Sequence, residues 1–202
     1  MSVNNLILGI TGNIASGKSL VAEAFARHGA ALVDADQLAR QIVAPQSPVL
    51  QQLVTLFGAA ILLENGELNR EKLGEIIFAD SAARQELNRI THPAIAELAI
   101  GRLQMLKSKP GVPLIVYEAP LLFEAGAEGR VDQVLVVSIE PEIQLQRLMA
   151  RDGLDEAAAK QRVDAQMPQQ EKLARADYVI DNSGSVEDVL RQVGALWKRL
   201  TG

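Results

Sequence analysis

One segment near the start of the chain, Gly12 to Ser19, constrains the fold most strongly. It reads G-x-x-x-x-G-K-S, and it lies between a short apolar run, Leu6–Thr11, and a segment with apolar residues at helical spacing, Leu20–Ala26. This signature binds phosphate when it connects a buried strand to a helix. An ordinary Gly/Ser-rich turn is the alternative, and the position at the first strand-to-helix junction favours a P-loop.

The residue types of this loop fit phosphate chemistry. Gly12 and Gly17 allow the backbone to turn so that successive N–H groups point inward. The N-terminus of the helix that begins near Lys18 adds a positive dipole. In such loops the lysine, here Lys18, contacts the β- and γ-phosphates, and the hydroxyl of the last residue, here Ser19, binds Mg²⁺.

Composition narrows the class of protein. The length of 202 residues fits one domain or one core with an insertion. Hydrophobic residues make up 48% of the chain, which is enough for a sizeable core. A net charge of −5 and an aromatic content of 3% argue against general binding to nucleic acid or anionic membranes. The absence of cysteine excludes disulfides and thiolate metal sites. We see neither a secretory signal nor a membrane-spanning run, and we expect a soluble cytoplasmic protein.

The order of the predicted elements indicates an α/β protein. A second short strand at Ala31–Asp34 follows the first helix, and two βα steps of this length predict a parallel sheet. Three further apolar runs are typical of strands: Val112–Tyr117, Gln133–Ile139 and Tyr178–Ile180. A last helix is predicted over Val186–Leu200.

A helical insertion of about seventy residues separates the second strand from the third, far longer than an ordinary connection. Within it we predict a turn at Asn65-Gly66 and a helix over Arg70–Phe78 that Asn69 caps. Two more helices are predicted over Ser81–Ile90 and Pro93–Leu106, with Pro93 in the first turn of the second. Insertions of this kind often carry substrate recognition.

Acidic residues follow two of the predicted strands. Asp34 and Asp36 share one side if the chain stays extended after the second strand, and a carboxylate there can accept the proton of a substrate hydroxyl. Asp36 can equally cap the next helix, and the two roles are compatible. Glu118 ends the third strand, where it is either a Walker B-like metal ligand or a plain polar residue; the sequence slightly favours the latter.

Arginines gather after the fourth strand. Arg147 and Arg151 are four residues apart on one helix face, and Arg162 follows in a polar, charged stretch. A solvated charged face is the alternative, because acidic residues are interspersed. Next to a P-loop, we expect a lid whose arginines stabilise the charge of a transferring phosphoryl group.

Motifs along the whole chain resemble the dephospho-CoA kinase family. They are the P-loop with Gly9-Ile10-Thr11, Val33-Asp34-Ala35-Asp36 with Ala39-Arg40, Phe57-Gly58, Leu68-Asn69-Arg70, Leu87-Asn88-Arg89-Ile90 with His92-Pro93, Pro120-Leu121-Leu122-Phe123-Glu124, Gln146-Arg147-Leu148 with Arg151-Asp152, Gln166, and Ala176 to Asn182. The resemblance implies phosphorylation of the ribose 3′-hydroxyl of dephospho-CoA by ATP, the last step of coenzyme A biosynthesis. It also implies a P-loop kinase fold with five parallel strands. The core would be residues 1–36, 110–145 and 175–202, the helical substrate subdomain 37–109, and the lid 146–174.

The resemblance also implies roles for particular residues. Asp36 would be the base, with Lys18 and Arg147 catalytic, Asn182 near the adenine, and Ser19 on Mg²⁺. The ATP phosphates would be wrapped by Ala15, Ser16, Gly17, Lys18, Ser19 and Leu20. Residues 120–124 would line the acceptor site.

The chain departs from the family pattern at three loop positions. Asn13 and Ala15 stand where glycine is usual, and Leu20 where threonine is common. Because the motif glycines remain, we expect phosphate binding to survive.

Two other functions are compatible with a P-loop: a small-molecule kinase with a different acceptor, and a nucleotide-dependent switch. Another small-molecule kinase, of the nucleotide or shikimate type, would share the loop but take a different acceptor, and the acceptor-side motifs argue against it. A GTPase switch would need an Asn-Lys-x-Asp element, which the sequence lacks. We expect ATP and Mg²⁺, a small-molecule substrate, no nucleic acid or membrane partner, and a monomer or weak homo-oligomer.

Overall fold

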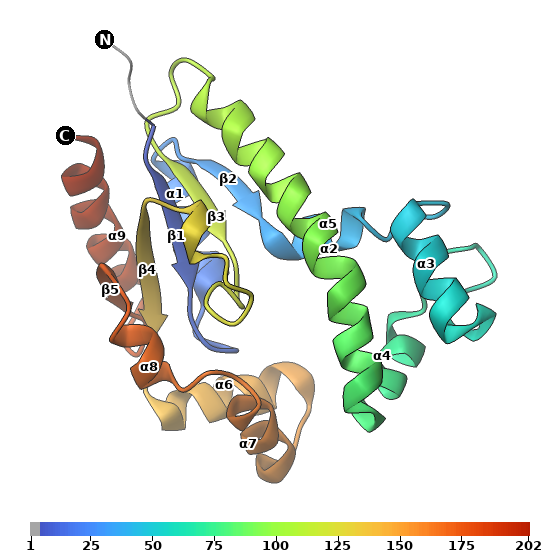
Figure 1. Cartoon of the computed structure of the whole chain (residues 1–202). Helices are drawn as coiled ribbons and strands as arrows, with labels where there is room; N and C mark the ends of the chain where they lie inside the picture. The colour runs from blue at the N-terminus through green and yellow to red at the C-terminus, as the bar shows by residue number, and fades with distance from the viewer. Residues whose placement is uncertain (1–4) are drawn as a thin grey trace. The chain divides into compact units, whose positions relative to one another are not determined.

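The computed structural model describes residues 5–202, which form two compact units. One contains the chain up to Asp34 together with Arg102–Gly202, and the other is Ala35–Gly101. Figure 1 shows the elements of both.

The first unit is built on a five-stranded sheet in which every pairing is parallel. Its order is β2-β3-β1-β4-β5. The strands are β1 (Ile7–Thr11), β2 (Ala31–Asp34), β3 (Ile115–Glu118), β4 (Gln133–Ser138) and β5 (Tyr178–Asp181). The parallel α/β fold expected from the sequence is confirmed.

β1 is buried along its whole length, as a central parallel strand requires. One face of the sheet is covered by α1 (Lys18–Arg27) and α9 (Val186–Thr201), which pack against each other. Phe25 of α1 and Val193 of α9 join Leu8 and Ile10 in this core. The core holds the start of α1, and hence the P-loop, against the sheet.

Three helices of this unit lie between β4 and β5. α6 (Pro141–Asp152) begins with proline in its first turn, and α7 (Glu156–Asp164) and α8 (Gln169–Leu173) lead to β5. We refer to residues 141–173 as the α6–α8 segment. The polar stretch between the fourth and fifth strands therefore forms short helices.

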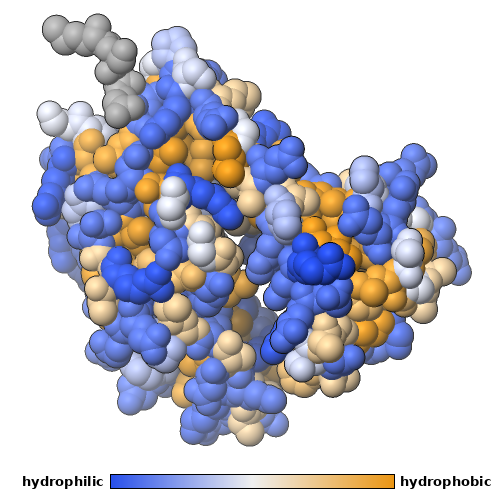
Figure 2. Space-filling view, in the orientation of Figure 1, coloured by the Kyte–Doolittle hydropathy of each residue, from blue (hydrophilic) through white to orange (hydrophobic). Residues whose placement is uncertain are grey.

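The second unit is helical. It contains α2 (Ala35–Gln41), α3 (Pro48–Phe57) and α4 (Arg70–Ala79), with a small core of Val43, Leu53, Ile61 and Leu73. The predicted cap of α4 is confirmed, because the side chain of Asn69 accepts a hydrogen bond from the Lys72 N–H. Figure 2 shows apolar side chains reaching the surface of this unit, where Leu56, Leu63 and Phe78 are exposed.

The two helices expected around His92-Pro93 are in fact one. α5 runs unbroken from Ser81 to Lys107 with Pro93 in its interior, so the predicted start at Pro93 is wrong. Apolar residues pack on both sides of the proline: Leu87 and Ile90 join the core of the helical unit, and Ala99 is buried. This packing offsets the hydrogen bond that proline removes. Among residues 5–202, no helix combines the length and apolar character needed to cross a membrane.

Candidate active site

The P-loop connects β1 to α1 in a conformation that two glycines make possible. Gly12 has φ +152°, and a Cβ there would lie 2.5 Å from the Val137 carbonyl oxygen on the neighbouring strand. Gly17, the N-cap of α1, has φ +84°. Any side chain at Gly12 would displace backbone atoms, so the loop requires the glycine that the motif supplies.

Ala15 also has a positive φ, +60°. An L-residue with a side chain pays about 1 kcal/mol for this conformation. The loop nevertheless keeps its turn, because Ser16 N–H donates to the Asn13 carbonyl at 3.1 Å. The alanine therefore fits the loop at the cost of local strain.

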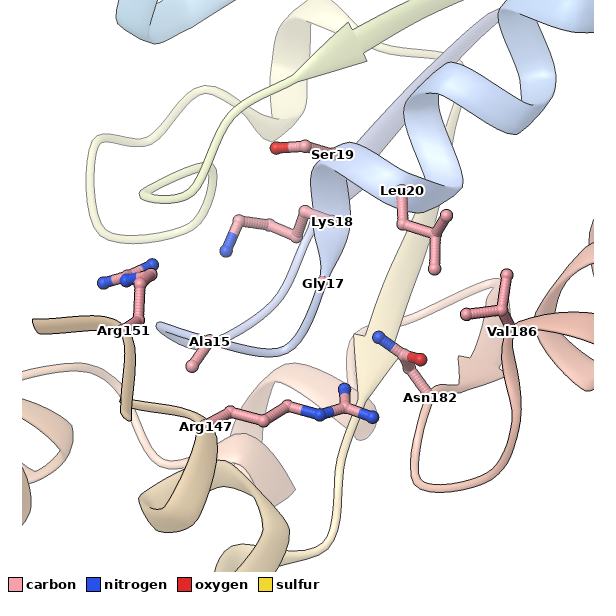
Figure 3. Close-up of a pocket in the computed structure, with 9 residues that line it drawn as sticks. All are labelled: Ala15, Gly17, Lys18, Ser19, Leu20, Arg147, Arg151, Asn182 and Val186. Carbon is pink, nitrogen blue, oxygen red and sulfur yellow. The ribbon is translucent and has the colours of Figure 1, made fainter. Parts of the chain in front are cut away.

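A cavity of about 450 Å³ opens beside the loop. Figure 3 shows its lining, with Leu20, Val186 and Asn182 at one end and Lys18, Ala15 and Arg151 at the other. Gly17, Ser19 and Arg147 complete the wall. The structure thus brings every residue predicted to bind the donor, apart from the buried Ser16, to one cavity with a cationic and an apolar end.

The two functional side chains of the loop are held by specific partners. The Lys18 ammonium donates to the carbonyl oxygens of Gly12 and Asn13, both at 3.0 Å. The Ser19 hydroxyl donates to Glu118 Oε1 at 2.9 Å. Glu118 lies at the end of β3, where it is in register with Ile10 of β1, two residues before the loop.

This contact changes the reading of Glu118, which the sequence slightly favoured as a plain polar residue. A hydroxyl and a carboxylate oxygen side by side suit Mg²⁺, which takes few protein ligands and oxygen atoms only. No cluster of three or more His, Cys, Asp or Glu residues suited to a metal occurs within residues 5–202. The hydroxyl of Ser19 and the carboxylate of Glu118 are oxygen donors that fit a magnesium ion.

The arginines after β4 differ in how they are engaged. Arg151 and Arg162 both pair with Asp152, at 2.8 and 2.7 Å. The hydrogen bond from Arg151, aided by the charge of Arg162, holds the pKa of Asp152 below its usual value. Arg147 has no ion pair within the described part of the chain, so its guanidinium is the one of these three that is left to bind an anion in the cavity.

Asn182 supports the loop as well as lining the cavity. It follows β5, is buried, and donates from Nδ2 to the Ser16 carbonyl at 2.7 Å. Its own N–H donates to Ser138 of β4 at 2.9 Å. Asn182 thus connects the ends of β4 and β5 to the P-loop.

Replacing Gly17 by alanine is expected to destabilise the protein by about 2 kcal/mol. The new Cβ would lie 2.0 Å from Asn182 Nδ2, so the buried Asn182–Ser16 hydrogen bond cannot be kept. Urea unfolding followed by the fluorescence of Trp197, the chain's single tryptophan, measures the loss. Gly66→Ala is the matched control, because Gly66 has a similar φ of +81° with no atom near its Cβ position. An equal loss in both variants would mean that backbone strain, not the clash with Asn182, sets the cost.

Comparisons with known proteins agree with the family resemblance seen in the sequence. The family model described as dephospho-CoA kinase matches residues 6–188. The chain is 60% identical to the dephospho-CoA kinase of Syntrophotalea carbinolica over 96% of this chain and 92% of that protein. The chain belongs to the dephospho-CoA kinase family.

Solved structures agree with the sequence comparison. The dephospho-CoA kinase of Campylobacter jejuni is similar with a TM-score of 0.75 at 31% identity, covering 96% of each chain. The Thermus thermophilus protein TT1252 gives a TM-score of 0.82 at 37% identity, covering 98% of this chain and all of that one. The P-loop kinase fold is therefore confirmed.

Asp36 lies in the other unit, immediately after β2. α2 begins at Ala35, so Asp36 is in the first turn of the helix and not at its cap, and that alternative is wrong. The expectation that Asp34 and Asp36 share a side through an extended chain is also wrong, because Asp34 ends the strand and Asp36 is helical. The role of Asp36 as base stays a prediction.

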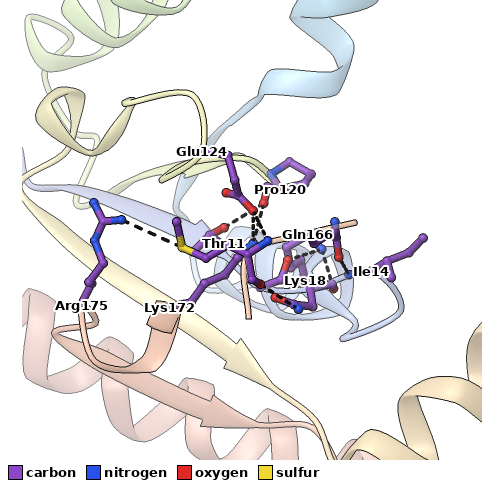
Figure 4. Close-up of polar contacts among 11 residues, drawn as sticks. Thr11, Ile14, Lys18, Pro120, Glu124, Gln166, Lys172 and Arg175 are labelled. Carbon is purple, nitrogen blue, oxygen red and sulfur yellow. Dashed lines mark hydrogen bonds and ion pairs between the residues drawn. The ribbon is translucent and has the colours of Figure 1, made fainter. Parts of the chain in front are cut away.

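The segment 120–124 has contacts that the sequence did not indicate. Lys172 of α8 is completely buried and pairs with Glu124 at 2.8 Å, and its ammonium also donates to the Pro120 carbonyl at 3.3 Å. The Thr11 hydroxyl donates to the same carbonyl, at 3.1 Å (Figure 4). Glu124 thus neutralises a buried lysine, and the assignment of residues 120–124 to the acceptor site stays a prediction.

Proposed function

We propose that this chain transfers the γ-phosphoryl group of ATP to the ribose 3′-hydroxyl of dephospho-CoA. The observation that carries the proposal is its membership of the dephospho-CoA kinase family together with a cavity lined by the P-loop and by Arg147, which has no ion pair among residues 5–202. Such a cavity suits the donor half of a kinase site.

In this proposal the cavity binds ATP. The loop N–H groups and Lys18 bind its phosphates, while Leu20 and Val186 offer apolar surface to the adenine beside Asn182. Ser19 and Glu118 would hold Mg²⁺, which would neutralise phosphate charge. Arg147 would stabilise the negative charge that develops on the transferring group.

The acceptor would be bound with the help of the helical unit. Asp36 would accept the proton of the 3′-hydroxyl as its oxygen attacks the γ-phosphorus. We assign residues 37–109 to substrate binding and residues 146–174 to a lid that excludes water around the reacting groups. We assign the rest of the described chain to the core; in the structure the unit that contains the sheet ends at Asp34 and resumes at Arg102.

A coupled ADP-release assay across candidate acceptors tests the proposal. Dephospho-CoA is expected to stimulate ADP release strongly, whereas AMP and shikimate, the acceptors of the alternative kinase types, should not. Phosphorus NMR of the product should show a new phosphomonoester at the 3′ position. Absence of stimulation by dephospho-CoA would overturn the proposal, and stimulation by AMP or shikimate alone would favour the alternative.

A further inference from the structure

Two glutamines from different parts of the α6–α8 segment bind the two peptide groups next to Ile14 in the P-loop. Gln144 of α6, only 5% exposed, donates from Nε2 to the Ile14 carbonyl at 2.9 Å. Gln166, between α7 and α8, accepts the Ile14 N–H on Oε1 at 2.7 Å. Figure 4 shows the second of these contacts beside Lys18. Ile14 is thereby held on both sides by side chains more than 100 residues away in the sequence.

A third contact reinforces this arrangement. The side chain of Asn13 donates from Nδ2 to the Met167 carbonyl at 3.2 Å, directly after Gln166. Asn13 is 3% exposed, so this contact is shielded from water. The first half of the loop is therefore bonded to the α6–α8 segment at three points, the third of them through the side chain of Asn13.

The positions of the glutamines relate the loop to Arg147. Gln144 and Arg147 are three residues apart on α6 and so share a face of the helix. A bond from Gln144 to the loop therefore fixes the turn of α6 that carries Arg147 beside the cavity. Gln166 holds the loop from the other end of the segment.

We propose that Gln144 and Gln166 are positioning residues that clamp the Ile14 peptide groups, with Gln144 placing Arg147 over the phosphate site. Only the expected effect of the clamp on kcat rests on the proposed function, whereas its hydrogen bonds do not. The hydrogen bonds of both glutamines go to backbone atoms of Ile14 and not to a group proposed to react. Each acts through a neighbour: Gln144 through Arg147, and Gln166 through the backbone of the loop.

The two glutamines have opposite hydrogen-bonding roles, which gives a sharp test. Gln144 must donate, so glutamate, which has no donor when ionised, should fail there as methionine does. Gln166 must accept, so glutamate should preserve its contact while methionine should not. Glutamate at the buried position 144 also adds a desolvation cost, whereas methionine does not, so a failure shared by Gln144→Met and Gln144→Glu reports the lost donor and not a buried charge.

Amide hydrogen exchange by NMR on the full chain without nucleotide reads the clamp directly. Exchange of the amides of Ile14 and its loop neighbours is expected to accelerate about tenfold or more in Gln144→Met, Gln144→Glu and Gln166→Met. In Gln166→Glu it should stay within about twofold of wild type. Protection retained in Gln144→Glu, or lost equally in both glutamate variants, would overturn the clamp.

The kinetic arm tests the placement of Arg147. Gln144→Met should lower kcat about tenfold in the wild-type background. In the Arg147→Ala background it should lower kcat by no more than about twofold, because the residue through which it acts is already gone. A larger fall there, or an unchanged kcat in the single variant, would overturn this role. The exchange measurement needs no acceptor, so it stands or fails independently of dephospho-CoA as substrate.

Discussion

Asp36→Asn is expected to lower turnover by about 10²- to 10⁴-fold while ATP still binds with near-normal affinity. Asparagine keeps the size of the side chain but cannot take the proton of an attacking hydroxyl. The chemical step therefore loses its base, whereas the P-loop, which belongs to the other unit, is untouched. Steady-state kcat and calorimetric titration with a non-hydrolysable ATP analogue separate the two effects.

The chain offers a matched control for the loss of charge. Asp36 lies in the first turn of α2, so its removal also weakens a favourable interaction with the helix dipole, worth about 0.3–1 kcal/mol. Glu71 lies in the first turn of α4 in the same unit, and Glu71→Gln loses the same kind of interaction. That variant should keep its turnover. Near-normal turnover in Asp36→Asn would remove Asp36 as the base.

The fold was predictable where local pattern and tertiary packing agree. The central strands are buried on both faces, so their apolar runs stand out between polar loops, as at Ile7–Thr11. α5 was mispredicted because proline is a local signal against helix, whereas the packing of Leu87 and Ala99 on either side of Pro93 is a tertiary one. A single sequence shows the first signal and not the second.

The residues of the site also fall into those that the local sequence predicts and those that only tertiary contacts reveal. The P-loop residues are consecutive, so their spacing and their position between a strand and a helix predict a phosphate-binding loop without any tertiary information. The contact between Ser19 and Glu118 joins residues 99 apart, and one acidic residue after an apolar run does not indicate it. Gln144 and Gln166 carry no charge and occur in ordinary polar stretches, so nothing in their local sequence points to Ile14. The sequence likewise does not distinguish Arg147 from Arg151 and Arg162, whereas the structure shows that the last two pair with Asp152.

Lys18→Ala is expected to lower kcat/KM by about 10²- to 10³-fold. The substitution removes the ammonium that would face the β- and γ-phosphates and also its two hydrogen bonds to the carbonyls of Gly12 and Asn13. Steady-state kinetics with ATP as the varied substrate measures the loss, and Trp197 fluorescence during urea unfolding measures any accompanying instability.

Two further variants separate charge from loop structure. Lys18→Arg keeps the positive charge but replaces a compact ammonium with a planar fork, so its activity should lie between those of wild type and Lys18→Ala. Lys160→Ala is the control for removing a lysine, because Lys160 is exposed on α7 and pairs with Glu156. It should leave kcat/KM unchanged, since exposed ion pairs contribute little. Wild-type rates in Lys18→Ala would contradict the phosphate role of Lys18, and a deficit fully restored in Lys18→Arg would show that charge at this position is sufficient without the ammonium geometry.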